Sequence, residues 1–375
     1  MKASILAVGT EITTGQIINQ NASWISQKLI PLGLKIPFHL TVPDDRTLIL
    51  KALDFLAKDS EWLFVTGGLG PTSDDFTRDL ISQWSGQDLK FHEPSWEYVQ
   101  RRLSSRGYPV RESQKQQCFF PEGSLVLENA NGTANGFYLK VETPTNSLHV
   151  FVLPGPPKEI EGLWNDRLLE IISPLAENLI KTITKSWDTL GVGESEVAHI
   201  VEGFAQKFPH KDKLEIGYRV HLPYVEVKIS YTANNGLLVN PLVQDIDRAL
   251  AHITVAKDFV DLAQITSQLL KDIDFTFYDY ITGGLLHRRL QPFLKNHSRW
   301  SWKQSPDAPF ADLFEGEENF MALLPHDDGR KMLFIYDYLG TRKQFLVDSA
   351  YTSPQMQDRN KYYFTEMALV HFNQT

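Results

Sequence analysis

The chain has 375 residues, 42% of them hydrophobic and 22% charged, and these proportions exclude a disordered or fibrous protein. One hydrophobic core rarely serves so long a chain, so we expect two or three domains. The formal net charge of −9 argues against broad nucleic-acid binding, which needs a basic surface, and the single cysteine, Cys118, excludes an intramolecular disulfide and any multi-cysteine metal site.

The first segment, residues 1–168, alternates short apolar runs with apolar residues at helical spacing. This rhythm predicts a doubly wound, mostly parallel sheet with helices on both faces. The opening apolar run stops at Gly9, too early for a signal peptide, and no apolar run reaches the roughly 18 residues of a membrane span, so we expect a cytoplasmic protein without membrane contact. The expected elements are strands over 3–8, 35–42 and 63–65, a helix capped by Asn21, a helix over 46–58, and a hairpin of 135–141 and 147–153 around a Pro-Thr-Asn turn.

The rest of the chain predicts two more domains. Residues 169–255 are expected to form a small α+β module, and residues 256–375 an α/β domain. The expected elements are, in order, strand 181–189, helix 194–208, strand 224–231, turns over 234–241, helix 243–252, helix 262–272, strands 274–278, 320–324 and 331–338, and helix 360–372. Five histidines lack the spacing of metal ligands, and we expect each to be an ordinary surface or core residue: His92, His149, His210, His221 and His326.

Polar and glycine-rich loops follow the predicted strands of the first segment. Glu11 follows the first strand, Asp44 the second, the loop TGGLGPTSDDFT (66–77) the third, and LPGPPKE (153–159) the hairpin. Because the carboxyl ends of parallel strands share one edge of a sheet, and ligands bind along that edge, these loops should converge.

The glycine loop suggests a site for a phosphate. Gly67, Gly68 and Gly70 have no Cβ, so backbone N–H groups could crowd around an anion beside a helix that begins between Ser73 and Thr77. Carboxylates beside a phosphate usually need a bridging cation such as Mg²⁺, which Asp74 or Asp75 could bind, or either could activate a water. The alternative is a tight turn followed by a helix N-cap. The loop is neither a P-loop nor a Gly-x-Gly-x-x-Gly motif.

Together these stretches resemble the CinA (competence/damage-inducible protein) family, whose first domain is similar to the molybdopterin-binding domain of molybdenum-cofactor biosynthesis proteins. The matching motifs are GTEITTGQIINQNASWIS (9–26), TGGLGPTSDDFT (66–77), NANGTANGF (129–137) and LPGPPKEI (153–160). The resemblance implies hydrolysis of a nucleotide pyrophosphate bond, with ADP-ribose as the substrate, Mg²⁺ or Co²⁺ as the cofactor, K⁺ as a further candidate, and a homodimer. The implied catalytic residues are Asp44, Asp74 and Asp75, the metal ligands Glu11, Asp44 and Asp75, and the phosphate-binding residues Gly67, Gly68, Gly70, Thr72, Ser73, Thr77, Gly155 and Lys158.

The second and third segments resemble the rest of that family less closely. LGVGESEVA (190–198) and GYRVHLPYVEVKISYTA (217–233) are similar to its KH-like middle domain, but without a basic Gly-x-x-Gly clamp we expect no RNA binding. The family often ends in a nicotinamide mononucleotide deamidase domain with an Ala-Glu-Ser-Cys-Thr-Gly-Gly motif. Here Thr282, Gly283 and Gly284 match, but Tyr280 replaces the serine nucleophile, and the acidic stretch 306–319 lies where a phosphate loop belongs. We expect a degenerate site without deamidase activity on a retained fold.

Three hypotheses follow. The leading one is a metal-dependent nucleotide pyrophosphatase in the first domain. The second is a scaffold that binds a nucleotide or pterin without turnover, and the third is residual nicotinamide mononucleotide deamidation.

Overall fold

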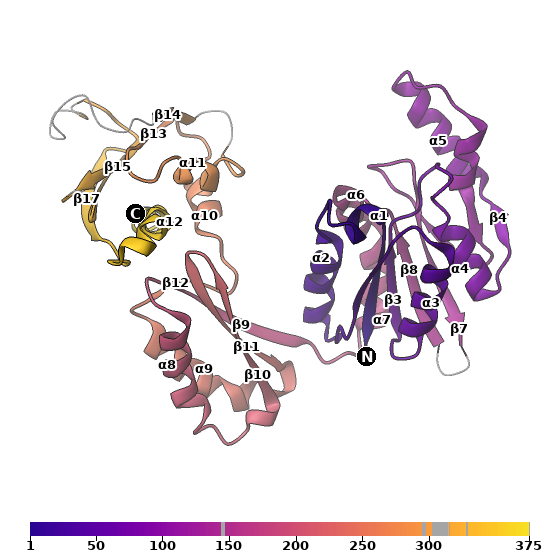
Figure 1. Cartoon of the computed structure of the whole chain (residues 1–375), viewed down its shortest axis with the longest axis horizontal. Helices are drawn as coiled ribbons and strands as arrows, with labels where there is room; N and C mark the ends of the chain where they lie inside the picture. The colour runs from indigo at the N-terminus through magenta and orange to yellow at the C-terminus, as the bar shows by residue number, and fades with distance from the viewer. Residues whose placement is uncertain (144–146, 295–297, 302–313, 315, 328, 375) are drawn as a thin grey trace. The chain divides into compact units, whose positions relative to one another are not determined.

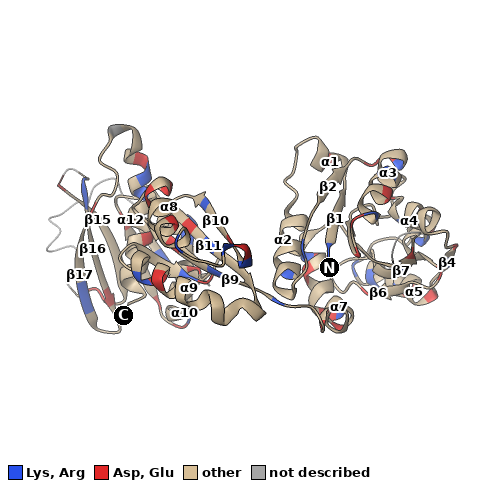
Figure 2. Ribbon diagram, turned by 90° about the horizontal axis from the view of Figure 1, so that it is seen from below, with Lys and Arg blue, Asp and Glu red and all other residues tan. Residues whose placement is uncertain are grey.

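The computed structural model describes residues 1–143, 147–294, 298–301, 314, 316–327 and 329–374, and the expected Pro-Thr-Asn turn lies outside them (Figure 1). The chain separates into two compact units, Met1–Thr182 and Ile183–Thr375, which are treated one at a time below. Among the described residues, no helix combines the length and apolar character needed to cross a membrane. Figure 2 shows Lys and Arg interspersed with Asp and Glu on the elements of each unit.

The first unit is built on a six-stranded sheet of order β2-β1-β3-β8-β7-β6. The first four strands of this order are parallel to one another. Strand β7 pairs antiparallel with β8 on one side and with β6 on the other. The prediction of a mostly parallel sheet is therefore confirmed. The strands are β1 (Ala3–Val8), β2 (His39–Val42), β3 (Trp62–Thr66), β6 (Leu125–Leu127), β7 (Gly136–Glu142) and β8 (Ser147–Leu153).

Alternation along the strands gives this sheet two buried faces. Leu6 and Val8 of β1 belong to the core with α3 and α4, whereas Ala3 and Ile5 belong to the core with α2, α6 and α7. Side chains that alternate in this way require helices on both sides of the sheet, as predicted. The helices are α1 (Thr10–Thr13), α2 (Gln20–Leu29), α3 (Arg46–Ala57), α4 (Thr77–Ser85), α5 (Glu93–Ser105), α6 (Pro157–Leu163) and α7 (Leu169–Ala176). A two-stranded sheet of β4 (Leu89–Phe91) and β5 (Phe119–Pro121) accompanies α5.

Two predicted boundaries in this unit are wrong. The strand expected over 35–42 is reduced to β2, with an isolated bridge at Lys35, because Pro37 has no N–H to donate to a ladder. The cap of α2 is Asn19 rather than Asn21, since the Asn19 side chain accepts a 3.1 Å hydrogen bond from the Ala22 N–H.

The second unit opens with a four-stranded sheet of order β10-β11-β9-β12 that packs against two helices. Its elements are β9 (Thr182–Leu190), α8 (Glu194–Ala205), β10 (Leu214–His221), β11 (Tyr224–Thr232), α9 (Gly236–Leu250) and β12 (Thr254–Lys257). The turns expected over 234–241 are wrong, because α9 begins at Gly236 and includes Pro241. The proline removes a hydrogen bond only to the carbonyl of Leu237, a first-turn residue that is 91% exposed.

The same unit ends with a five-stranded sheet of order β14-β13-β15-β16-β17. Strands β14, β13 and β15 are parallel, and β16 pairs antiparallel with both β15 and β17. Helices α10, α11 and α12 pack against this sheet to form its core. The elements are α10 (Leu262–Leu269), β13 (Phe275–Asp279), α11 (Leu285–Leu290), β14 (Ser298–Ser301), β15 (Phe320–His326), β16 (Lys331–Tyr338), β17 (Thr341–Asp348) and α12 (Gln357–Phe372).

Candidate functional site

The carboxyl ends of four parallel strands are level in the first unit. Val8 of β1 pairs with Val42 of β2, and Thr66 of β3 pairs with Leu153 of β8. The loops that follow these strands line one pocket of about 860 Å³. The predicted site residues in its wall are Glu11, Asp44, Gly67, Gly68, Gly70, Asp74, Asp75 and Gly155. The expectation that these loops converge at one edge of the sheet is therefore confirmed.

Close contacts fix the conformation of the glycine loop. Gly67 has a φ of +97° and Gly68 a φ of +66°, values in the left-handed region that side chains disfavour. A Cβ at Gly67 would overlap the Val8 carbonyl oxygen, and one at Gly68 would overlap Thr77 Oγ1. The loop therefore requires glycine at both positions for reasons of space as well as backbone angle.

Two backbone N–H groups of the predicted anion site already donate hydrogen bonds within the fold. The Gly67 N–H donates to the Leu153 carbonyl at 3.1 Å, and the Thr77 N–H, the first of α4, donates to the Gly68 carbonyl at 3.1 Å. An anion in this pocket would therefore have to meet other parts of the loop.

Arg78 supports the loop from beneath, a role that the sequence analysis missed. Its buried guanidinium donates to the carbonyls of Leu69, at 2.7 Å, and Gly70, at 3.1 Å. Burial lowers the pKa of Arg78 to about 10. The available signal was its position in the first turn of α4, where the helix dipole disfavours a cation.

The acidic side chains at the pocket accept hydrogen bonds from neighbouring threonines. Asp44 Oδ2 accepts from the N–H and the hydroxyl of Thr10, both at 2.8 Å. Asp75 Oδ2 accepts from the Thr72 N–H at 2.9 Å and from the Thr72 hydroxyl. A side-chain hydrogen bond with Thr72 also lowers the pKa of the exposed Asp74. Neither aspartate caps α4, whose N-cap position is Phe76, so the N-cap alternative is wrong.

The proposed metal ligands do not form a compact cluster. Three side chains of Asp, Glu, His or Cys with ligand atoms within 4.8 Å of one another occur, in the part of the chain that the structure describes, only as a group in the second unit. Glu11, Asp44 and Asp75 thus line one pocket, but their carboxylate oxygens do not all lie within 4.8 Å of one another. Carboxylate oxygens still suit a hard cation, which would complete its ligand shell from a bound phosphate or water.

A second polar group in the pocket wall was also missed. Glu159 accepts a 2.7 Å hydrogen bond from Asn129 Nδ2, and burial raises the pKa of this glutamate above its usual value. Asn129 also accepts from the N–H groups of Asn131 and Gly132, which shapes the Asn-Gly loop beside the pocket. Asn21 is in the wall as well, and it donates to the Gly155 carbonyl at 2.7 Å. The motifs 9–26, 129–137 and 153–160 contained these residues, but nothing in their spacing showed which would meet.

Four predicted phosphate-binding residues lie outside the pocket wall: Thr72, Ser73, Thr77 and Lys158. Thr72 bonds Asp75, whereas Thr77 Oγ1 is buried under Gly68 and has no hydrogen-bond partner among the described residues. Lys158 is exposed, and its carbonyl accepts from Asn131 Nδ2.

Comparison with known proteins places the chain in a family. Residues 4–173 match the family model of the "Probable molybdopterin binding domain". The "Putative competence-damage inducible protein" of Clostridium novyi is 32% identical over 298 residues, which are 77% of this chain and 69% of the relative. The chain belongs to the competence-damage inducible protein (CinA) family. The member from Desulforamulus reducens is 29% identical over 301 residues, 77% of this chain and 70% of its own length.

Two solved structures are similar to parts of this CinA chain. The protein CinA from Thermoplasma acidophilum, described as of unknown function, is 30% identical with a TM-score of 0.40, over 46% of this chain and 98% of its own. The tungsten cofactor synthesizing protein MoaB from Pyrococcus furiosus is 19% identical with a TM-score of 0.33, over 47% of this chain and 95% of its own.

The turn after β13, where the sequence analysis expected a degenerate deamidase site, is held together by hydrogen bonds of its own. Asp279 Oδ1 accepts from the Thr282 N–H at 2.8 Å, and Asp279 Oδ2 accepts from the Gly284 N–H at 3.0 Å. Tyr280, at the position of the expected nucleophile, packs against a buried apolar cluster that includes Phe320. Residues 306–313 and 315 of the acidic stretch lie outside the described residues.

Proposed function

We propose that the first unit binds a small nucleotide at the carboxyl edge of its sheet and hydrolyses a pyrophosphate bond, with ADP-ribose as the representative substrate. The observation that carries the proposal is the convergence of Glu11, Asp44, the glycine loop and Asp75 on one pocket. At about 860 Å³, the pocket falls in the 300–1,000 Å³ range typical of small-molecule sites.

In this reaction the chain positions the substrate and controls protons. Gly68 and Gly70 are the loop positions where a phosphate can approach the backbone, and the positive end of α4 lies behind them. Glu11, Asp44 and Asp75 would hold Mg²⁺ or Co²⁺, which when bound supplies charge neutralisation and a more acidic water. Glu159 has a raised pKa, which suits a residue that gives and takes a proton.

The test is hydrolysis of ADP-ribose by the full chain with Mg²⁺ or Co²⁺, comparing Asp75→Asn with the native protein. We expect a rate loss of about 100-fold or more, because Asp75 would be a direct metal ligand and even changes to outer-shell partners of a metal cost about 10–100-fold. Asp88→Asn, at an exposed turn outside the pocket, is the matched control and should keep the native rate. Full activity in Asp75→Asn would contradict the assignment.

The scaffold hypothesis remains the second candidate, and one observation favours it. The oxygens Asp44 Oδ2 and Asp75 Oδ2 already accept hydrogen bonds from Thr10 and Thr72, as carboxylates with a structural role do. Calorimetric binding of ADP-ribose without phosphate-bond cleavage would favour the scaffold. Deamidase activity is expected to be absent, because Tyr280 replaces the nucleophile and packs against an apolar cluster.

A further inference from the structure

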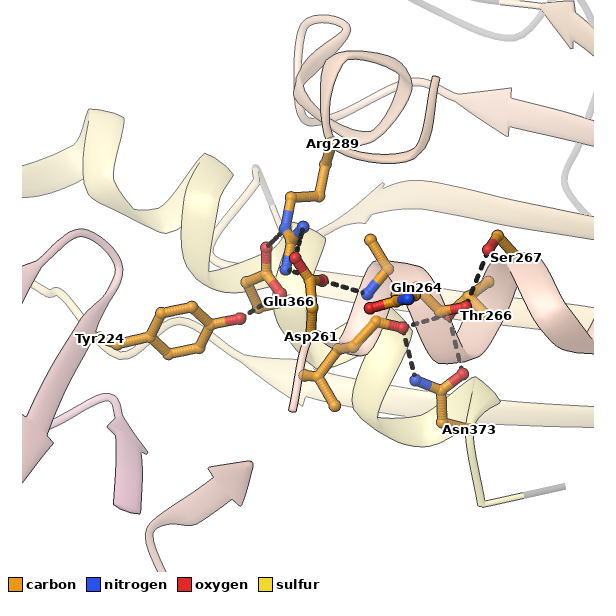
Figure 3. Close-up of polar contacts among 10 residues, drawn as sticks. Tyr224, Asp261, Gln264, Thr266, Ser267, Arg289, Glu366 and Asn373 are labelled. Carbon is orange, nitrogen blue, oxygen red and sulfur yellow. Dashed lines mark hydrogen bonds and ion pairs between the residues drawn. The ribbon is translucent and has the colours of Figure 1, made fainter. Parts of the chain in front are cut away.

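The second unit contains a cavity of about 660 Å³ that the proposed hydrolysis does not use. Asp188, His221 and Glu226 of the four-stranded sheet form part of its wall, and Arg289 and Glu366 form another part. Figure 3 shows the latter region, where Arg289 contacts the carboxylates of Asp261 and Glu366 and the Tyr224 hydroxyl donates to Glu366. Arg289 and the two carboxylates satisfy one another, whereas the first three residues bring one imidazole and two carboxylates together.

Three adjacent strands bring these potential ligands together. Asp188 lies on β9, His221 ends β10 and Glu226 lies on β11, and the sheet order β10-β11-β9 makes the strands neighbours. One ligand atom from each side chain lies within 4.8 Å of the other two, and His221 Nε2 is 3.0 Å from Asp188 Oδ1. No other such group of three occurs among the residues with described positions.

Glu226 is the buried carboxylate of this group. Its side chain is only 3% exposed, and its Oε2 receives no hydrogen bond of acceptable geometry from the described residues. Arg219 Nε at 2.8 Å and Lys228 Nζ at 3.1 Å are within ion-pair distance of that oxygen. These two ion pairs offset the cost of burying the carboxylate, and their cations sit on side chains that are 59% and 34% exposed, so a metal ion at Glu226 would have to displace them.

Asp188 increases the negative charge at the same point. Its side chain is 15% exposed, and one of its oxygens lies within 4.8 Å of a ligand atom of Glu226. Two carboxylates this close repel each other, and a shared cation would relieve that repulsion.

We propose that Asp188, His221 and Glu226 form a binding site for a divalent transition metal ion, with Zn²⁺ as the representative. An imidazole nitrogen with two carboxylates suits zinc, whereas Mg²⁺ and Ca²⁺ prefer oxygen ligands alone. Zinc bonds of about 2.0–2.1 Å put tetrahedral ligands roughly 3.3 Å apart, so side-chain rotations suffice to close the present arrangement. The fourth position faces the cavity and leaves room for water or a small ligand.

The experiment titrates the untagged full chain, stripped with a chelator, with ZnCl₂ in a calorimeter and with Co²⁺ in an absorption spectrometer. We expect saturable binding, with one equivalent of Zn²⁺ per chain assigned to this site. The visible absorption spectrum of bound Co²⁺ should be that of an ion with a low coordination number. His221→Ala should abolish that equivalent. Asp188→Asn and Glu226→Gln should each weaken it by more than about 100-fold, beyond the 10–100-fold typical of outer-shell changes.

Two controls locate the ion. His252→Ala removes an exposed histidine of the same unit and should bind like the native chain. Asp44→Asn alters the pocket of the first unit and should leave the equivalent lost in His221→Ala intact, which separates this site from the proposed hydrolytic metal. Zn²⁺ should also raise the Tm of the native chain but not of His221→Ala. Absence of saturable Zn²⁺ binding, or unchanged binding in His221→Ala, would overturn the proposal.

Discussion

Replacing Arg78 tests whether a buried cation holds the glycine loop in shape. Burial lowers the pKa of Arg78 to about 10, well below its ordinary value, so keeping its charge inside costs roughly 3 kcal/mol. Hydrogen bonds from a charged donor contribute about 1.5–3 kcal/mol each, so those to the Leu69 and Gly70 carbonyls roughly offset this cost. In Arg78→Met the Leu69 carbonyl loses its donor and the Gly70 carbonyl keeps only a 3.4 Å hydrogen bond from Gln116 Nε2, at about 1–3 kcal/mol for each lost bond, and the methionine recovers only part by burying its own surface. We expect a net loss of about 3 kcal/mol.

The assay is differential scanning calorimetry of the full chain, with hydrogen–deuterium exchange to locate the change. For a unit of this size the loss corresponds to a Tm about 6–12 °C lower, with faster exchange over residues 66–77. Arg78→Lys keeps the charge but has no planar fork to reach two carbonyls, so it should lose about half as much. If both variants stay within 1 kcal/mol of the native protein, the guanidinium does not support the loop and this reasoning is refuted.

Three further changes probe other parts of the chain. Gly70→Ala places a Cβ on the Asp75 carboxylate and should lower ADP-ribose turnover nearly as much as Asp75→Asn while leaving the Tm within a few degrees. Glu159 takes up a proton on folding because its folded pKa is raised above 4.5, so native stability should fall as pH rises from 4.5 through that raised pKa. Melting curves across this window should show a flatter profile for Glu159→Gln, and an unchanged profile would contradict the raised pKa. Glu366→Ala removes a buried partner of Arg289 and should destabilise the second unit by about 3 kcal/mol in calorimetry. A change below 1 kcal/mol would mean that Arg289 finds compensation in Asp261.

Sequence reasoning was most successful where local pattern and topology agree. The short, fully apolar runs of β1 and β3 are typical of buried strands in a parallel sheet. Parallel strands bring the loops that follow them to one edge of the sheet, so the convergence of Glu11, Asp44 and Asp75 could be predicted. Strand β16 was predicted with its observed bounds, Lys331–Tyr338, because apolar residues alternate along it.

The missed features depend on contacts between segments far apart in the sequence. Arg78 and Glu159 look like surface residues until the loops they bond are in place. Strand β17 is a polar strand at the edge of its sheet, so it has little apolar signal. Strand β10 does alternate between half-buried and exposed residues, so the sequence contained enough signal to predict it. Asp188, His221 and Glu226 have no motif spacing, because a sheet, rather than a helix or turn, brings them together.

The glycine loop also has a consequence for how the chain tolerates mutation. Gly68 and Gly70 are partly exposed, a class of position that usually accepts many residues. Any side chain at these two positions meets Thr77 Oγ1 or the Asp75 carboxylate, and at Gly67 the Val8 carbonyl. In a saturation library selected for folding and ligand binding, we expect these positions to be as depleted of substitutions as Phe64 in the core. A library planned from surface exposure alone would treat them as free to vary.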